Sequence, residues 1–325
     1  MSDAALAFPR TPSTWLEARA PVLLDWTAEK ARAFGKANLT FRHELHQRPM
    51  FTDGGLAAAL DAYPRERLGV FTMGVDPVDW GSWRRGAAGE LSGAQLLEAV
   101  GQGRIWLNLR AANAHLPEYA ALSDEIFADK ERHTGLRTLK RDVGLLISSP
   151  NAQVFYHLDT PLVSLWQVRG EKRVWVYPPE APFVGDEQLE RIVLRETAEQ
   201  FDYSPRWDSG ADVVDLTPGR MVTWRQNAPH RIENGPMVNV SLSLEFMTPR
   251  AIARANLIYG NGVLRRRMGL QTPIRDRLDG QGLARIAAAR AAKALKLQKA
   301  SERVLPMTFR LDASAPGKLI EIRAS

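Results

Sequence analysis

The chain has 325 residues, of which 45% are hydrophobic and 25% are charged, and its formal net charge at pH 7 is +6. This composition is typical of a globular protein and excludes disordered, collagen-like and coiled-coil chains. No apolar run reaches the roughly 18 residues of a transmembrane helix, and Met1–Arg10 lack the pattern of a secretory signal, so we expect a cytoplasmic protein. Cysteine is absent, so a metal would need His, Asp or Glu ligands.

Residues 1–100 predict a mixed, mainly helical flank. Helices are expected from Trp15, over 28–33, over 56–62 and over 92–100, with Thr14, Thr27 and Ser92 as N-caps. Residues 53–55 (Asp-Gly-Gly) predict a turn before the third helix. That helix should end at Tyr63, because Pro64 disfavours a helical conformation in the residue before it. A strand is expected over 68–73.

Residues 101–249 are expected to begin with a strand over 104–109 and a helix over 117–130, and the remainder is rich in β-forming residues. Short β-rich runs separated by Pro, Gly, Asn and Asp cover 144–148, 153–158, 162–168, 172–177, 220–224 and 237–246. Closely spaced strands with turn signals predict a sandwich or barrel. Residues 169–171 (Arg-Gly-Glu) predict a hairpin turn between two of these strands.

Residues 250–325 differ from the rest in charge. They contain 16 Lys or Arg and 5 Asp or Glu, whereas the residues before them contain 27 and 32. We expect no strands after Pro249, and helices over 251–256 and 283–299. In the second helix an apolar stripe must be buried somewhere, and it consists of Leu283, Ile286, Ala287, Ala291, Ala294 and Leu295. The basic surface suits either a solvated helix face, which we favour, or a nucleic acid.

The residues that carry chemistry begin with His157-Leu158-Asp159. Residues two apart in a strand share a face, so His157 and Asp159 can offer two ligands to one metal ion. The pattern alone is weak, since it occurs often by chance. Pro218-Gly219 starts a second short strand, and His230 follows it. His230 either completes a facial triad of two His and one carboxylate, which suits non-haem Fe(II), or only satisfies a loop.

Lys172 lies 15 residues after His157, just past the expected hairpin turn. A lysine inside a barrel is costly unless it meets an anion, and a dicarboxylate bound to the metal would supply one. The alternatives are that Lys172 faces solvent, or that Arg173 is the residue that points inward.

Residues 144–179, with His157-Leu158-Asp159, the hairpin 169–171 and Tyr177-Pro178-Pro179, resemble the cupin-like JmjC oxygenases, in particular the branch that includes asparaginyl hydroxylases. Residues 218–234 are similar to the second cupin motif, which delivers the distal metal histidine. The resemblance covers roughly residues 100–250. It implies a mainly β fold with flanking helices, built on a double-stranded β-helix (cupin, jelly roll).

The same resemblance implies the cofactors. Fe(II) would be bound by His157, Asp159 and His230, and 2-oxoglutarate would place its distal carboxylate on Lys172. Two further family positions depart from the pattern, because a hydroxyl residue is replaced by Val154 and an asparagine by Val163. The candidate substitutes for these oxoglutarate contacts are Asn108, Ser164, Thr223 and Asn239.

The resemblance therefore predicts a dioxygenase that hydroxylates a protein or peptide side chain or a small molecule, and that converts 2-oxoglutarate to succinate. A different metal-dependent cupin enzyme and a non-enzymatic ligand-binding cupin remain alternatives. The chain is expected to divide into a flank (1–100), a barrel (101–249) and a basic helical region (250–325). In enzymes that it resembles such helices pair two subunits, so we expect a homodimer.

Overall fold

The computed structural model describes residues 21–270, 273–274, 279–296 and 305–323, and an expected helix from Trp15 lies outside them. Its centre is a double-stranded β-helix, as the sequence predicts. Eight successive strands pass between two sheets, and they are β5 (Leu139–Ser148), β6 (Gln153–His157), β7 (Leu162–Arg169), β8 (Lys172–Val176), β9 (Asp212–Leu216), β10 (Arg220–Thr223), β11 (His230–Asn234) and β12 (Asn239–Met247).

The smaller sheet has the order β6-β11-β8-β9, and the larger one contains the run β10-β7-β12-β5. All neighbours within these two runs are antiparallel. This interleaving of strands far apart in the chain is the jelly-roll topology. The two sheets face each other around an apolar interior, which includes Val163, Leu165, Val174, Val222 and Ile232.

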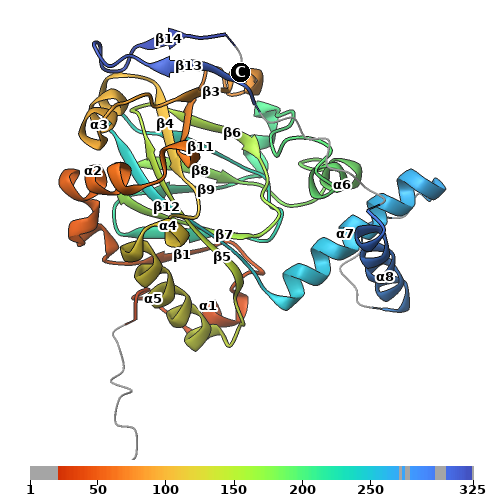
Figure 1. Ribbon diagram of the computed structural model, residues 1–325. Coiled ribbons are helices and arrows are strands. Elements are labelled where there is room, and N and C mark those ends of the chain that lie inside the picture. The colour runs from red at the N-terminus through yellow and green to blue at the C-terminus, as the bar shows by residue number, and fades with distance from the viewer. Residues whose placement is uncertain (1–20, 271–272, 275–278, 297–304, 324–325) are drawn as a thin grey trace, which may run out of the picture.

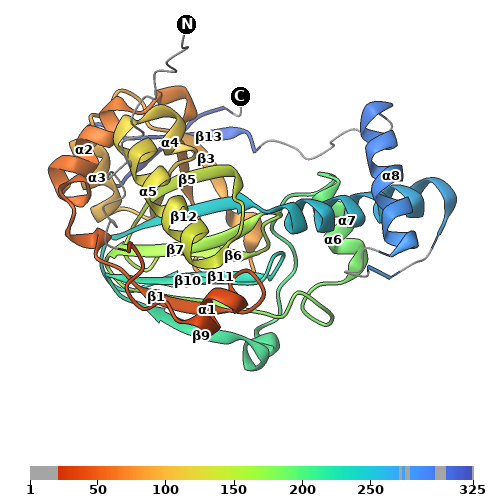
Figure 2. The same cartoon turned by 90° about the horizontal axis from the view of Figure 1, so that it is seen from below.

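The larger sheet extends to ten strands by additions at both edges. At one edge β1 (Leu39–Arg42) pairs with β10; at the other edge β4 (Ile105–Leu109), β2 (Gly69–Thr72) and β3 (Arg84–Ala87) follow β5. Helices cover the outer face of this sheet, as Figures 1 and 2 show. They are α2 (Asp53–Ala62), α3 (Gly93–Gln102), α4 (Ala112–His115) and α5 (Pro117–Thr134).

The capping residues of the flank confirm two expectations and correct one. Thr27 caps α1 (Ala28–Ala33), and Ser92 caps α3 in a capping box with Gln95. The expected turn at 53–55 is wrong, because Thr52 caps a helix that begins at Asp53. Gly55 lies where a Cβ would approach Pro49 O to 2.5 Å, so this glycine is needed for close packing.

The region after Pro249 forms an arm and then returns to the sheet. The helices α7 (Pro249–Met268) and α8 (Gly280–Ala294) project from the barrel beside α6 (Asp186–Val193), as Figures 1 and 2 show. The expectation that strands stop at Pro249 is wrong. β13 (Met307–Leu311) pairs in parallel with β3, and β14 (Leu319–Glu321) completes a hairpin. This pairing depends on a partner more than 200 residues away, which local sequence patterns do not reveal.

The face that α8 buries is not the stripe expected from the sequence. Gly282, Arg285, Ala289 and Ala292 are its buried residues, whereas Leu283 and Leu295 are 59% and 68% exposed. A Cβ at Gly260 of α7 would lie 2.1 Å from Arg285 O, so a glycine lets the two helices pack closely. None of the described helices is long and apolar enough to cross a membrane.

Candidate metal centre

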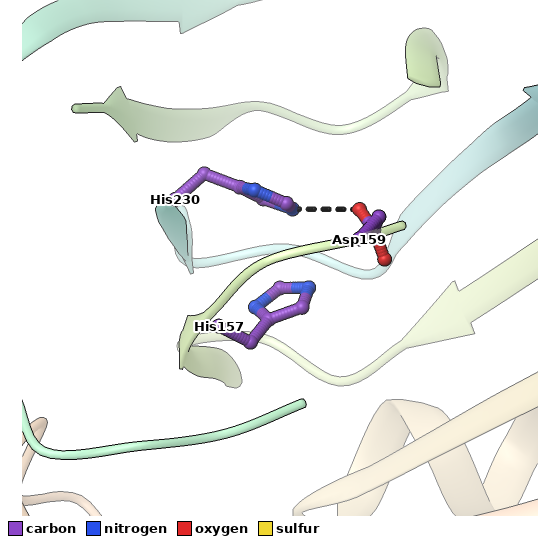
Figure 3. Close-up of side chains that lie close together, drawn as sticks. All are labelled: His157, Asp159 and His230. Atoms are coloured by element: carbon purple, nitrogen blue, oxygen red, sulfur yellow. Dashed lines mark ion pairs between the residues drawn. The ribbon is translucent and has the colours of Figure 1, made fainter. Parts of the chain in front are cut away.

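Three side chains converge at one end of the barrel. His157 is the last residue of β6, Asp159 follows two residues later, and His230 is the first residue of β11. β6 and β11 are neighbours, and their register sets His230 opposite His157. Each of the three residues offers one ligand atom, and these atoms lie within 4.8 Å of one another. Figure 3 shows both imidazoles and the carboxylate turned toward a common point.

Backbone carbonyls fix the orientation of both imidazoles. His157 Nδ1 lies 2.7 Å from Phe155 O, and His230 Nδ1 lies 3.1 Å from Ala228 O. A carbonyl oxygen only accepts, so each Nδ1 carries the proton and donates. Each Nε2 then keeps its lone pair for a ligand, which is the usual arrangement in metal sites.

Burial keeps the His230 imidazole neutral near pH 7. Desolvation and the nearby His157 lower the pKa of His230 to about 3, although Asp159 acts in the opposite direction. His230 Nε2 and Asp159 Oδ2 are 3.3 Å apart, the contact drawn as a dashed line in Figure 3. With the proton on Nδ1, this contact joins two lone pairs, which repel each other unless a cation lies between them. The donor set therefore fits a divalent metal such as Fe(II).

A cavity of about 260 Å³ opens beside these three residues. Aromatic side chains form one of its walls, since Phe71, Trp83 and Trp106 lie in it with ring centroids 5.1–5.3 Å apart. Other parts of its lining are aliphatic and include Val154 and Val163. The two positions that depart from the family pattern thus face the cavity with apolar side chains.

Charged residues occur near the metal-ligand end of the cavity. Arg110 Nη2 lies 3.3 Å from Glu245 Oε2, and Arg110 Nε lies 3.9 Å from Asp142 Oδ2. Burial, followed by the nearby Asp159, raises the pKa of Glu245 to about 7, and Arg110 opposes this shift. Arg110, Asp142 and Glu245 are not among the site residues expected from the sequence. A pattern that could have revealed Glu245 is the alternation of Ser241, Ser243 and Glu245 with leucines, because it predicts that β12 has one polar face.

Lys172 lies inside the barrel but does not line the cavity, and its partner on β11 is Asn234, four residues along the strand from His230. It shares a face of β8 with Val174 and Val176, which pack in the barrel interior, and it is 6% exposed. Burial lowers the pKa of its ammonium group to about 7. Within the described part of the chain, no hydrogen bond or ion pair engages Lys172 Nζ. Arg173 is the outward residue, and it pairs with Asp215.

The structure brings only one of the four substitute residues to the cavity. Asn108 lines it. Ser164 and Thr223 lie on the outer face of the larger sheet, where Ser164 Oγ accepts from Lys130 and Thr223 Oγ1 donates to Val163 O. Asn239 lies at the far end of β12, and its Oδ1 accepts from Gln167 Nε2. None of these three residues lines the cavity.

The chain matches no protein-family model and no curated protein sequence. It is similar to the solved structure of E. coli ycfD at 17% identity, over 84% of this chain and 69% of that one, with a TM-score of 0.49. A structure of the ribosomal oxygenase YcfD from Escherichia coli with cobalt and 2-oxoglutarate shares 18% identity, over 80% of this chain and 63% of that one, at a TM-score of 0.45. A Pseudomonas putida prolyl-4-hydroxylase shares 13% identity, over 68% of this chain and 97% of that one, at a TM-score of 0.34.

Proposed function

We propose that this protein is an Fe(II)- and 2-oxoglutarate-dependent oxygenase that hydroxylates a substrate placed in the cavity beside His157, Asp159 and His230. The observation that carries the proposal is the convergence of these three side chains, with both Nε2 lone pairs directed at one point. When bound, the iron and the oxo acid would supply an oxidant made from dioxygen that hydroxylates a C–H bond, with release of succinate and carbon dioxide.

The chain's own residues would position the reactants. The triad would occupy three coordination positions on one side of the metal and leave the others open to the cavity. The apolar walls around Val154 and Val163 would exclude water from the reaction. Asn108, a candidate oxoglutarate contact from the sequence, lines this cavity and would offer an uncharged polar group to the cofactor.

Lys172 is the proposed partner of the distal oxoglutarate carboxylate. Val176 of β8 lies opposite His230, and Lys172 lies opposite Asn234. These two levels are four residues apart, which is about 13 Å along a strand. An extended lysine side chain and an extended dicarboxylate, placed end to end, suit a gap of this size. Lys172 is a buried ammonium group with no hydrogen-bond or ion-pair partner among the residues that the structure describes, which also favours an anionic ligand.

A second candidate function rests on a specific observation. Lys172 does not line the cavity, and the two family positions for hydroxyl and amide contacts are the valines 154 and 163. These features favour a metal-dependent cupin enzyme that uses no oxoglutarate. The metal ligands would be the same, so only a cofactor experiment separates the two candidates.

The decisive experiment is anaerobic reconstitution with Fe(II), followed by exposure to oxygen with and without 2-oxoglutarate. We expect succinate to form only when both oxygen and oxoglutarate are present, and not in the variant His157→Ala. Metal binding without oxoglutarate binding would instead support the second candidate. Absence of metal binding would contradict both and favour a ligand-binding cupin.

The arm is proposed to pair two copies of the chain. Leu283 of α8 and Leu295, the C-cap of that helix, are exposed and give an apolar surface for this contact. Sedimentation equilibrium at micromolar concentration should give the mass of a dimer, and Leu283→Glu should give a monomer. We further propose that the substrate is a protein or peptide and that the protein acts in the cytoplasm. A nucleic acid is not favoured as a partner.

A further inference from the structure

A single loop approaches two of the three candidate metal ligands. Residues 224–229 connect β10 to β11, and Ala228 O accepts a hydrogen bond from His230 Nδ1 at 3.1 Å. The side chain of Asn227, one residue earlier, turns the other way toward the Asp159–Thr160 turn. The loop therefore contacts His230 by its main chain and the Asp159 segment by a side chain.

The contacts of Asn227 have a defined direction. Its Nδ2 donates to Asp159 O at 3.0 Å, and its Oδ1 accepts from Arg254 Nε at 3.2 Å. A flipped amide would set two acceptors together at Asp159 and two donors together at Arg254, so chemistry allows one orientation. Asn227 is 2% exposed and has a φ of 63°, a left-handed conformation that asparagine tolerates.

Gln226 reinforces the same connection. Its Nε2 donates to Thr160 O at 2.9 Å and to Ala251 O at 3.2 Å. Ala251 and Arg254 both belong to the first turns of α7, where Thr248 is the N-cap. Two neighbouring amide side chains thus join the turn that carries Asp159 to the base of the arm.

We propose that Asn227 is a positioning residue for the metal centre, which holds the Asp159 carboxylate toward His157 and His230 and is itself held by Arg254 of α7. The proposal rests on the metal centre of the proposed function. Asp159 lies beyond the end of β6, so no strand pairing of its own fixes its direction. The bond to its carbonyl oxygen restrains that turn, in the way that outer hydrogen bonds restrain metal ligands elsewhere.

The test measures the affinity of the full chain for Co(II) by titration calorimetry in the variant Asn227→Gly. Glycine adopts the left-handed conformation freely, so the substitution removes the side chain and keeps the loop geometry. Asn151→Gly is the matched control, because Asn151 also has a positive φ (55°) and lies in the turn between β5 and β6. We expect about tenfold weaker Co(II) binding in Asn227→Gly and unchanged binding in Asn151→Gly.

A second readout separates positioning from general stability. The thermal unfolding midpoint of each metal-free variant is measured in parallel. A lower midpoint for Asn227→Gly with Co(II) affinity equal to that of the wild type would overturn the proposal. If Asn227→Gly does not fold, Asn227→Asp takes its place, because Asp still accepts from Arg254 but cannot donate to Asp159 O. Wild-type affinity in that variant would likewise overturn it.

The wild-type protein and His157→Ala show which of the two proposals has failed. Co(II) binding by the wild type and none by His157→Ala would support the metal centre, so that equal affinities of wild type and Asn227→Gly would remove only the positioning role. A wild-type chain that binds no Co(II) would overturn the metal centre and the positioning role together.

Discussion

Two buried lysines lie on opposite sides of the larger sheet, and they differ in what surrounds them. Lys130 of α5 lies between the helices and the sheet, where its Nζ donates to Ser164 Oγ at 2.8 Å. Four aromatic rings surround it with centroids 4.8–5.8 Å away, and they belong to Phe34, Phe127, Trp166 and Phe246. Lys172 lies in the barrel interior, where within the described part of the chain no side chain or carbonyl binds its ammonium group.

Burial lowers the pKa of both lysines to about 7. Among the residues that the structure describes, Lys130 has a hydroxyl acceptor and the faces of four aromatic rings around its ammonium group, whereas Lys172 has neither. This difference indicates a structural lysine on the outer face and a ligand-binding lysine in the barrel. The same substitution at both positions tests the distinction.

The largest effect is expected for the stability of Lys130→Ala. This change leaves a void among four rings in a close-packed core and removes the bond to Ser164, so the free energy of unfolding should fall by about 3 kcal/mol. Urea denaturation of the metal-free protein measures this loss. Oxoglutarate binding to the folded variant should equal that of the wild type, and a changed affinity would contradict the structural assignment.

How far the sequence predicts the fold depends on whether a strand has one buried face or two. The alternation around His157 and Asp159 reveals a shared face, and the turns marked by Gly and Pro reveal most of the strands of the barrel. β7, in contrast, is buried on both faces, so its pattern does not show which face is the interior. For this reason Ser164 was expected in the barrel but lies against Lys130.

Contacts between distant segments account for the remaining differences. The arm returns to β3 through β13, and Asn227 meets Arg254 only because α7 starts beside the loop. The local sequence around these residues does not predict contacts between segments so far apart in the chain. The inward direction of Lys172 was one of two alternatives, and the structure decides it by pairing Arg173 with Asp215 outside.

The next largest effect is expected for oxoglutarate binding in Lys172→Ala. Loss of a charge-assisted contact to a buried carboxylate costs about 2 kcal/mol, which corresponds to roughly thirtyfold weaker binding. The free energy of unfolding should change little, because removal of an uncompensated charge offsets the lost packing. Calorimetric titration of the Co(II)-loaded protein with oxoglutarate measures the first effect. Equal affinity in variant and wild type would remove Lys172 from the site.

The smallest effect is a dependence of stability on pH. Both lysines have a folded-state pKa of about 7, lowered from 10.5 in the unfolded chain. Between these values the unfolded chain binds more protons than the folded one, so the free energy of unfolding rises with pH. Glu245 has the opposite sign, because its pKa is raised to about 7, and its contribution is lost as the pH rises through that value.

Glu245 is ionised in both states between pH 8 and pH 9.5, but Lys293 and the buried tyrosines, whose pKa values are lowered and raised respectively, also contribute to the pH dependence there. The difference between the wild type and Lys172→Ala therefore isolates Lys172. The thermal unfolding midpoint of the wild type should rise across this interval relative to that of Lys172→Ala, because the variant lacks the one group by which the two proteins differ. Saturating oxoglutarate should also weaken the rise in the wild type, because a bound carboxylate keeps Lys172 protonated. In Lys172→Ala oxoglutarate should leave the slope unchanged, and a change there would show that the ligand binds another titrating group.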